Sequence, residues 1–134
     1  MRVYSKIIEV KTYGPMVLHN ITNLVRKVVD LSNVEMGLAW LSVEGATPAL
    51  IILRNGEEKT FLNSLTKLIP FTGWRHGNAY AHLISTILST NIAIPIINKA
   101  LLINSDENIY LLETRSVYNH TRRVLVQIHE NEKP

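Results

Sequence analysis

The spacing of apolar residues along the chain follows two different periods, and each period predicts one kind of element. Between Asn20 and Leu31 the apolar side chains recur at intervals of three and four, which places them on one stripe of a helix. The same spacing predicts helices from Glu57 to about residue 68 and over about 78–89. Apolar and polar residues alternate in 122–129, as in a strand with one buried face. Further strands are predicted at 2–12, 36–43, 49–53, 92–97, 100–103 and 108–115.

The order of these elements predicts an α+β fold. Strands and helices do not alternate one for one, so a doubly wound parallel sheet is not expected. We expect a mainly antiparallel sheet with about three helices packed on one face, and hairpins joining the strands of the last forty residues. No glycine- or serine-rich linker, repeat or low-complexity segment divides the sequence. Residues 1–134 are therefore expected to form a single domain.

The composition is that of a folded domain. The chain has 134 residues, of which 46% are apolar and 19% charged, and this is enough apolar surface for an ordinary hydrophobic core. It contains no cysteine, which excludes disulfides, thiolate metal sites and thiol nucleophiles. The net charge of +3 is spread thinly, because the adjacent basic pairs Arg26–Lys27 and Arg122–Arg123 lie far apart in the sequence. We therefore expect no nucleic-acid partner.

The hydropathy pattern does not predict a membrane segment. The most apolar region, residues 92–103, is interrupted by Pro95 and Lys99 and is shorter than the ~20 residues that cross a bilayer. The first nine residues interleave charged and apolar side chains, unlike the apolar stretch of a signal peptide. We expect no membrane association and a cytoplasmic location.

The helix predicted over 78–89 carries the best candidates for a site. Asn78 and His82 are one turn apart, on the face opposite the apolar arc. This polar face either is simply solvated or lines a pocket in which the Asn78 amide orients the His82 ring. Arg75 and His76 directly precede the helix, where they would help to hold an anion at its N-terminus.

Several segments resemble one protein family. The sequence Asn-Ala-Tyr-Ala-His-Leu at 78–83 resembles the Asn-Ala-His-Ala-His-Leu signature of the YjbQ-like family, known as secondary thiamine-phosphate synthase. The resemblance implies that family's fold, a homotrimer, and condensation of a pyrimidine diphosphate with a thiazole phosphate to give thiamine phosphate. Similar segments follow in the same order across about residues 5–130, at 47–50, 94–96, 100–102, 109–113 and 122–127.

The chain departs from the family pattern at its polar motifs. Gly45 stands where the family has the histidine of a His-Thr-Thr motif, Ala46 replaces the next threonine, and Tyr80 replaces the first histidine of the helix signature. A tyrosine with its ordinary pKa near 10 does not act as a base at neutral pH. No resident metal is expected, because His76 and His82 are six residues apart and do not share a helix face.

The remaining candidates are one hydroxyl and two guanidinium groups. Glu113 and Arg115 share one face of the strand predicted at 108–115, and Arg122 opens the last strand. These groups either form a cross-strand ion pair or hold a phosphate or carboxylate. Thr47 is the retained threonine of the family motif and is expected at the rim of the pocket. Glu44 replaces the missing imidazole only if it points toward that pocket. The candidate site is therefore catalytic Asn78 and His82, with Thr47, His76, Arg115 and Arg122 as ligand-binding residues.

Three functions are consistent with these features. The favoured hypothesis is a lapsed family member that binds a small phosphate or carboxylate, or a partner, without the family's catalysis. The second is a weak thiamine-phosphate-synthase-type transferase, which would need Mg²⁺ for its two polyanionic substrates. The third is a structural domain that works as an oligomer. Whether the protein is an enzyme is open at this point.

Overall fold

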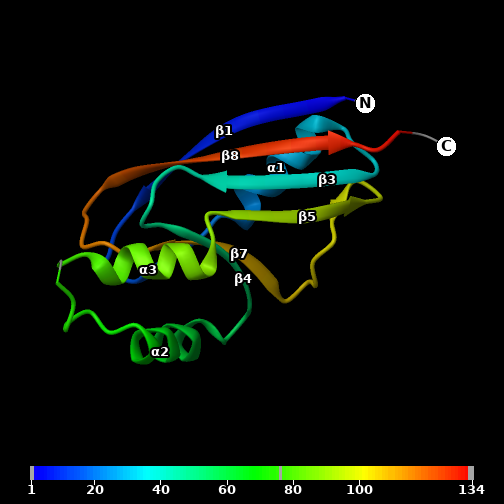
Figure 1. The fold of residues 1–134 in the computed structure, drawn as a ribbon. Helices are drawn as coiled ribbons and strands as arrows, with labels where there is room; N and C mark the ends of the chain where they lie inside the picture. Colours follow the sequence, from blue (N-terminus) through cyan, green and yellow to red (C-terminus); the bar gives the residue numbers. More distant parts are fainter. Residues whose placement is uncertain (1, 76, 133–134) are drawn as a thin grey trace.

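Two antiparallel sheets share one hydrophobic core in the computed structural model, which describes residues 2–75 and 77–132 (Figure 1). The strand order of the larger sheet is β1 (Val3–Thr12), β8 (His120–Glu130), β3 (Gly37–Val43), β5 (Asn91–Ile97) and β6 (Ala100–Leu101). The strand order of the smaller sheet is β2 (Val17–Asn20), β7 (Glu107–Glu113) and β4 (Ala49–Arg54).

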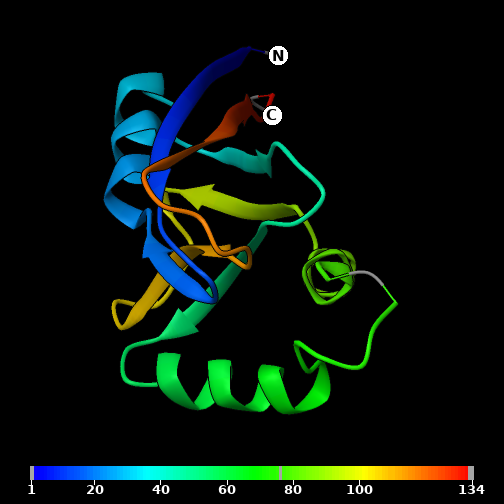
Figure 2. The same cartoon turned by 90° about the vertical axis from the view of Figure 1, so that its left-hand side faces the viewer.

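The described ranges contain three helices, which lie on different sides of the sheets (Figure 2). α1 (Thr22–Ser32) contacts strands of both sheets and buries Val25, Val28 and Val29 in the shared core. α2 (Glu58–Leu68) and α3 (Ala79–Leu88) pack through Leu65 and Ile84 into a second apolar cluster, which also contains residues of β4 and β7. The smaller sheet is thus covered on both faces.

The larger sheet is covered on one face. In β3 and β8 every second residue faces the core and is buried. The alternation of apolar and polar residues in the sequence predicts this pattern. On the opposite face Ile7, Leu38 and Trp40 are 53%, 38% and 42% exposed. In Figure 1 α1 lies behind β1, β8 and β3, and no helix of the described residues is drawn in front of these strands. This outer face of the larger sheet is defined by Val3, Ile7, Leu38, Trp40 and Ile97.

The predicted α+β class is confirmed, and most elements lie within two residues of their predicted bounds. Two sheets replace the one expected, and β2 was not predicted, because four residues are too few to show a period. The predicted strand at 100–103 is only the two-residue β6. In the described part of the chain no helix is long and apolar enough to cross a membrane.

The predicted hairpin between the last two strands is wrong. β7 pairs with β2 and β4 in the smaller sheet, whereas β8 pairs with β1 and β3 in the larger one. The reason is burial: β7 is buried continuously from Ile109 to Glu113, as the central strand of a covered sheet, while β8 buries only every second residue. The segment 114–119 therefore crosses from one sheet to the other.

Candidate functional site

The polar face of α3 opens onto a cavity of about 580 Å³. Asn78 and His82 line it together, as their one-turn spacing predicts, and Leu83 adds an apolar wall. The other walls come from Trp74 and Arg75 in the segment before the helix. Neither Asn78 nor His82 makes a side-chain hydrogen bond within residues 2–75 and 77–132, so both polar groups are available to a ligand.

The segment before α3 is held in place by two aromatic side chains. The Trp74 indole N–H donates to the Pro70 carbonyl oxygen at 2.5 Å. Phe71 packs edge-on against Tyr80 of α3, with ring centroids 4.7 Å apart. These contacts fix the side of the cavity that carries Arg75.

A second recess of about 310 Å³ lies on the other side of His82. It is lined mainly by hydroxyl-bearing side chains of α3 and the following residues, together with Ala46 of the loop between β3 and β4. The Ser85 hydroxyl donates to the Pro48 carbonyl oxygen at 2.6 Å and so joins α3 to that loop. The His82 imidazole therefore stands between an apolar cavity and a polar recess.

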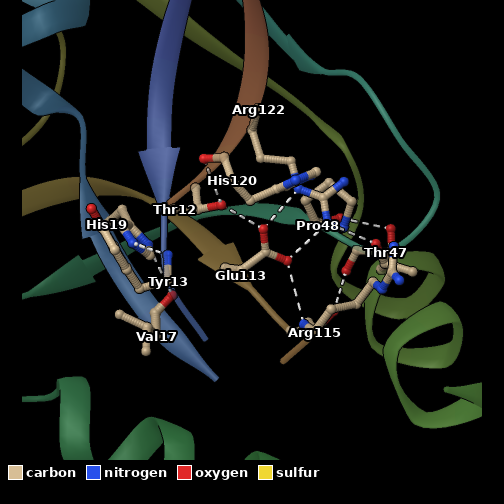
Figure 3. A network of polar contacts seen from close by, with 12 residues as sticks. Thr12, Tyr13, Val17, His19, Thr47, Pro48, Glu113, Arg115, His120 and Arg122 are labelled. Carbon is tan, nitrogen blue, oxygen red and sulfur yellow. Dashed lines mark hydrogen bonds and ion pairs between the residues drawn. The ribbon is translucent and has the colours of Figure 1, made fainter. Parts of the chain in front are cut away.

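A buried ion pair closes the core beside this loop (Figure 3). Arg122 donates from Nε to Glu113 Oε1 and from Nη2 to Oε2, both at 2.8 Å, and the Thr12 hydroxyl donates to Oε1 at 2.7 Å. Glu113 is fully buried and Arg122 is 8% exposed. Burial raises the pKa of the Glu113 carboxyl, but the hydrogen bonds from Arg122 and Thr12 outweigh it and leave the pKa below its ordinary value.

The ion pair also holds the loop between β3 and β4. The Thr47 hydroxyl accepts a hydrogen bond from Arg122 Nη2 at 3.0 Å (Figure 3). The Thr47 carbonyl oxygen accepts one from the Thr114 hydroxyl at 2.6 Å. Gly45 in this loop has a φ of +122°, in the region that favours glycine. A Cβ atom at Gly45 would lie 3.0 Å from Arg122 Nη1, so the loop leaves little room for a side chain.

Tyr80 is a packing residue in this arrangement. Its ring is 9% exposed, and its hydroxyl donates to the Thr114 carbonyl oxygen at 2.9 Å. Burial raises the pKa of the Tyr80 phenol, which keeps it protonated well above neutral pH. Tyr80 therefore offers no base at the place where the resemblance puts a histidine.

Comparison with known proteins places this geometry in a known group. The chain matches the family described as UPF0047 protein YjbQ-like over residues 6–131. It belongs to this family. A UPF0047 protein of Synechocystis sp. is 28% identical over 137 residues, which cover 95% of this chain and 92% of that protein. A UPF0047 protein of Archaeoglobus fulgidus is 30% identical over 125 residues, covering 87% of this chain and 94% of that protein.

Solved structures of YjbQ-like proteins share the fold. One is described as a YbjQ-like protein of unknown function from Sulfolobus solfataricus. It is 26% identical with a TM-score of 0.90, and the match covers 97% of this chain and 99% of that protein's chain. Another, from Clostridium acetobutylicum, is 29% identical with a TM-score of 0.85, and covers 92% of this chain and 99% of its own. These matches confirm the resemblance seen in the motifs, and the chain is a divergent YjbQ-like protein of uncertain activity.

Four of the six site residues predicted for this YjbQ-like protein fall into two groups. Asn78 and His82 share the cavity on α3, whereas Thr47 and Arg122 lie in the buried cluster around Glu113. Arg115 donates its backbone N–H to Glu113 Oε2 at 3.3 Å, and its side chain lines neither space beside His82. His76 lies outside the described residues.

Glu44 does not replace the missing imidazole. Its carboxylate pairs with Arg123 at the surface, and both line a shallow recess of about 150 Å³ with residues of the outer face of the larger sheet. His82 is not part of that recess. Among the described residues no group of three or more His, Cys, Asp or Glu side chains is arranged to hold a metal ion.

Sequence reasoning missed three residues that shape the site. Trp74 and Leu83 make the cavity largely apolar, and Ser85 ties the helix to the loop. An aromatic residue beside a basic one just before a helix is the signal that could have drawn attention to Trp74. The Ser85 contact is not visible in the sequence, because its partner Pro48 is far away along the chain.

Proposed function

We propose that this protein is a lapsed member of its family that binds a small phosphate or carboxylate beside His82. The observation that carries the proposal is the cavity of about 580 Å³ in which Asn78, His82 and Arg75 converge. The guanidinium supplies the positive charge, and the amide and imidazole supply hydrogen bonds that orient the anion. The Trp74 indole would cover the apolar part of the bound molecule.

The roles proposed for the other site residues differ from that of Arg75. Nε and Nη2 of Arg122 already donate to Glu113 and Thr47, so this guanidinium would hold the loop next to the ligand and not the anion itself. Arg115 would act on the anion only through the long-range field of its positive charge. Thr47 would hold the loop at the rim of the site through its hydrogen bonds with Arg122 and Thr114. Arg75 is thus the favoured partner of the anion.

Loss of the family's catalysis is proposed from the side chains at two positions. Gly45 carries no imidazole, and the Tyr80 hydroxyl is buried and donates to a carbonyl oxygen. Among the described residues that line the cavity, His82 is then the one that carries an imidazole. A weak thiamine-phosphate-synthase-type transferase, with Mg²⁺ on its polyanionic substrates, is the alternative, since Asn78 and His82 are retained from the family signature.

We also propose that the protein is a cytoplasmic homotrimer, as the family resemblance implies. The support for self-association is the outer face of the larger sheet, where Leu38, Trp40 and Ile97 are 38%, 42% and 39% exposed. A purely structural role for this oligomer is the third candidate function. A single-chain mass of 15.2 kDa by light scattering at micromolar concentration would refute the trimer.

The ligand proposal is tested by thermal shift of metal-stripped protein. Thiamine-pathway phosphates, other phosphates and carboxylates are titrated, each with and without Mg²⁺ or Zn²⁺. A ligand at 100 times its Kd stabilises the protein by about 2.7 kcal/mol. The variants His82→Ala and Arg75→Gln should abolish the shift, and His120→Ala, which alters a histidine outside the cavity, should keep it.

The outcomes separate the three candidate functions. A shift with ordinary phosphates or carboxylates that needs His82 supports the binding role. A shift confined to the pathway phosphates, followed by turnover with Mg²⁺, favours the transferase. Absence of any shift, or a shift that is unchanged in His82→Ala, refutes the site and leaves the structural role.

A further inference from the structure

A second cleft lies between α1 and the hairpin of β5 and β6, well away from the cavity at His82. Its volume is about 350 Å³, within the range of sites for small molecules. The helix and β6 are in direct contact, so the cleft is a groove between two packed elements. Its lining residues are Arg26, Val29, Asp30, Lys99, Ala100, Leu101, Ile103 and Ser105.

The cleft combines an apolar floor with a charged rim. Val29 and Leu101, which are 3% and 8% exposed, belong to the hydrophobic core and form the floor. Arg26, Asp30 and Lys99 are exposed and make no side-chain hydrogen bond or ion pair within residues 2–75 and 77–132. Two positive charges and one negative charge therefore line an apolar surface, and none of the three is held in an ion pair among the described residues.

The backbone presents Lys99 in a fixed position. The turn that joins β5 to β6 has positive φ angles at Asn98 and Lys99, of 54° and 66°. Asparagine and glycine are the usual residues in such a turn, so lysine at this position costs backbone energy. The Lys99 N–H donates to the Glu35 carbonyl oxygen at 2.9 Å, which anchors the turn beside the end of α1.

The charges on the rim indicate which ligand fits. Arg26 and Asp30 are one helical turn apart on α1, and Lys99 lies across the groove from them. A simple anion would meet the two cations but also the Asp30 carboxylate, which repels it. A molecule with both a carboxylate and an ammonium group would satisfy both signs.

We propose that this cleft binds a small zwitterion with an apolar body, of the α-amino acid class. The ligand carboxylate would accept hydrogen bonds from Arg26 and Lys99, and its ammonium group would donate to Asp30. Its apolar side chain would lie on the floor formed by Val29 and Leu101. No group of the His82 cavity takes part, so the inference is independent of the function proposed above.

The proposal is tested by isothermal titration of the wild-type chain with three small molecules. L-leucine carries both charged groups, 4-methylpentanoate lacks the ammonium group, and leucinamide lacks the carboxylate. Leucine should bind about tenfold more tightly than either analogue, because each analogue leaves a charge on the rim without its partner. His82→Ala should bind leucine as tightly as the wild type does.

Variants of the charged rim residues test whether leucine binds in this cleft. Arg26→Gln and Lys99→Gln should each weaken leucine binding about tenfold, whereas Asp30→Asn should remove the preference for leucine over 4-methylpentanoate. Lys27→Gln is the matched control, since it removes the same charge from the adjacent position on α1 outside the cleft and should change nothing. The proposal is overturned if leucine does not bind at millimolar concentration, if 4-methylpentanoate binds equally well, or if the rim variants bind as the control does.

Discussion

At the scale of single residues, Gly45 has a backbone conformation that does not suit a residue with a side chain. Its φ of +122° is strained for any residue with a side chain, and Arg122 Nη1 lies 3.0 Å from where a Cβ would be. The buried ion pair with Glu113 keeps the guanidinium in that place. The path of this loop and the position of Arg122 are therefore matched to a glycine at this position.

A substitution at Gly45 should consequently destabilise the fold. We expect Gly45→Ala to lower the free energy of unfolding by about 2–3 kcal/mol, from backbone strain together with crowding of Arg122 and Pro48. Gly56→Ala is the matched control, because its φ is +89° but a Cβ there has no neighbour within 4 Å, so its cost should be near 1 kcal/mol. Urea unfolding measures both values, and equal costs would show that Arg122 is not crowded.

Tyr80 and Arg122 show how far reasoning from single residues reaches in this chain. The spacing of Tyr80 from Leu83 and Ile84 places it on the apolar arc of the helix, which correctly predicts that Tyr80 is a packing residue. For Arg122 the sequence left open an ion pair or an anion clamp, and the structure has the ion pair. The decisive factor is burial, because a buried guanidinium needs a fixed counter-charge. The alternation of apolar and polar residues along a strand does not show which residues are buried where two sheets meet.

At the scale of elements, the helices and most strands could be predicted, but the pairing of the strands could not. Periodicity identifies each strand from its own residues, whereas pairing depends on which strands enclose the core. The continuous burial of β7 from Ile109 to Glu113 is the feature that separates it from β8. An uninterrupted apolar run in the sequence is the one signal that could have shown β7 to be a covered central strand.

The Glu113–Arg122 pair joins these two strands across the gap between the sheets, and it makes stability depend on pH. The folded-state pKa of Glu113 lies below its ordinary value of 4.5. The stabilisation is therefore complete above about pH 4.5 and is lost as the pH falls through the lower, folded-state pKa. Protonation of Glu113 leaves the Arg122 charge buried without its partner.

The measurement compares Glu113→Gln with the wild type by urea unfolding at several pH values. At pH 7 the variant should be less stable by about 3 kcal/mol, because the Arg122 charge is then buried unpaired. The difference should shrink as the pH falls below 4.5. Glu44→Gln is the matched control, since its ion pair with Arg123 is exposed and its removal should cost less than about 1 kcal/mol. A pH-independent deficit in Glu113→Gln would contradict this account.

At the scale of the whole molecule, the larger sheet has one face inside the core and one outside. Alternation predicts two faces for each strand, but it does not predict that the outer face would carry so many apolar side chains in neighbouring strands. On this face Leu38 and Trp40 of β3 lie opposite Pro95 and Ala93 of β5 and opposite His129 and Gln127 of β8. Val3 and Ile7 lie on β1, on the far side of β8. An exposed apolar surface on a sheet is typical of contact with another chain.

Leu38→Glu tests whether copies of the chain associate through this face. The side chain points away from the core and is 38% exposed, so the charge should be tolerated in a single chain but should disfavour burial between chains. By light scattering the wild type should have the mass of a trimer and the variant that of a 15.2 kDa monomer, with unchanged circular dichroism. Leu24→Glu, at a position on α1 that is 43% exposed, is the matched control and should remain trimeric. If the Leu38→Glu variant stays trimeric, the interface between chains lies on another face. If the wild type is monomeric, the His82 cavity acts within one chain.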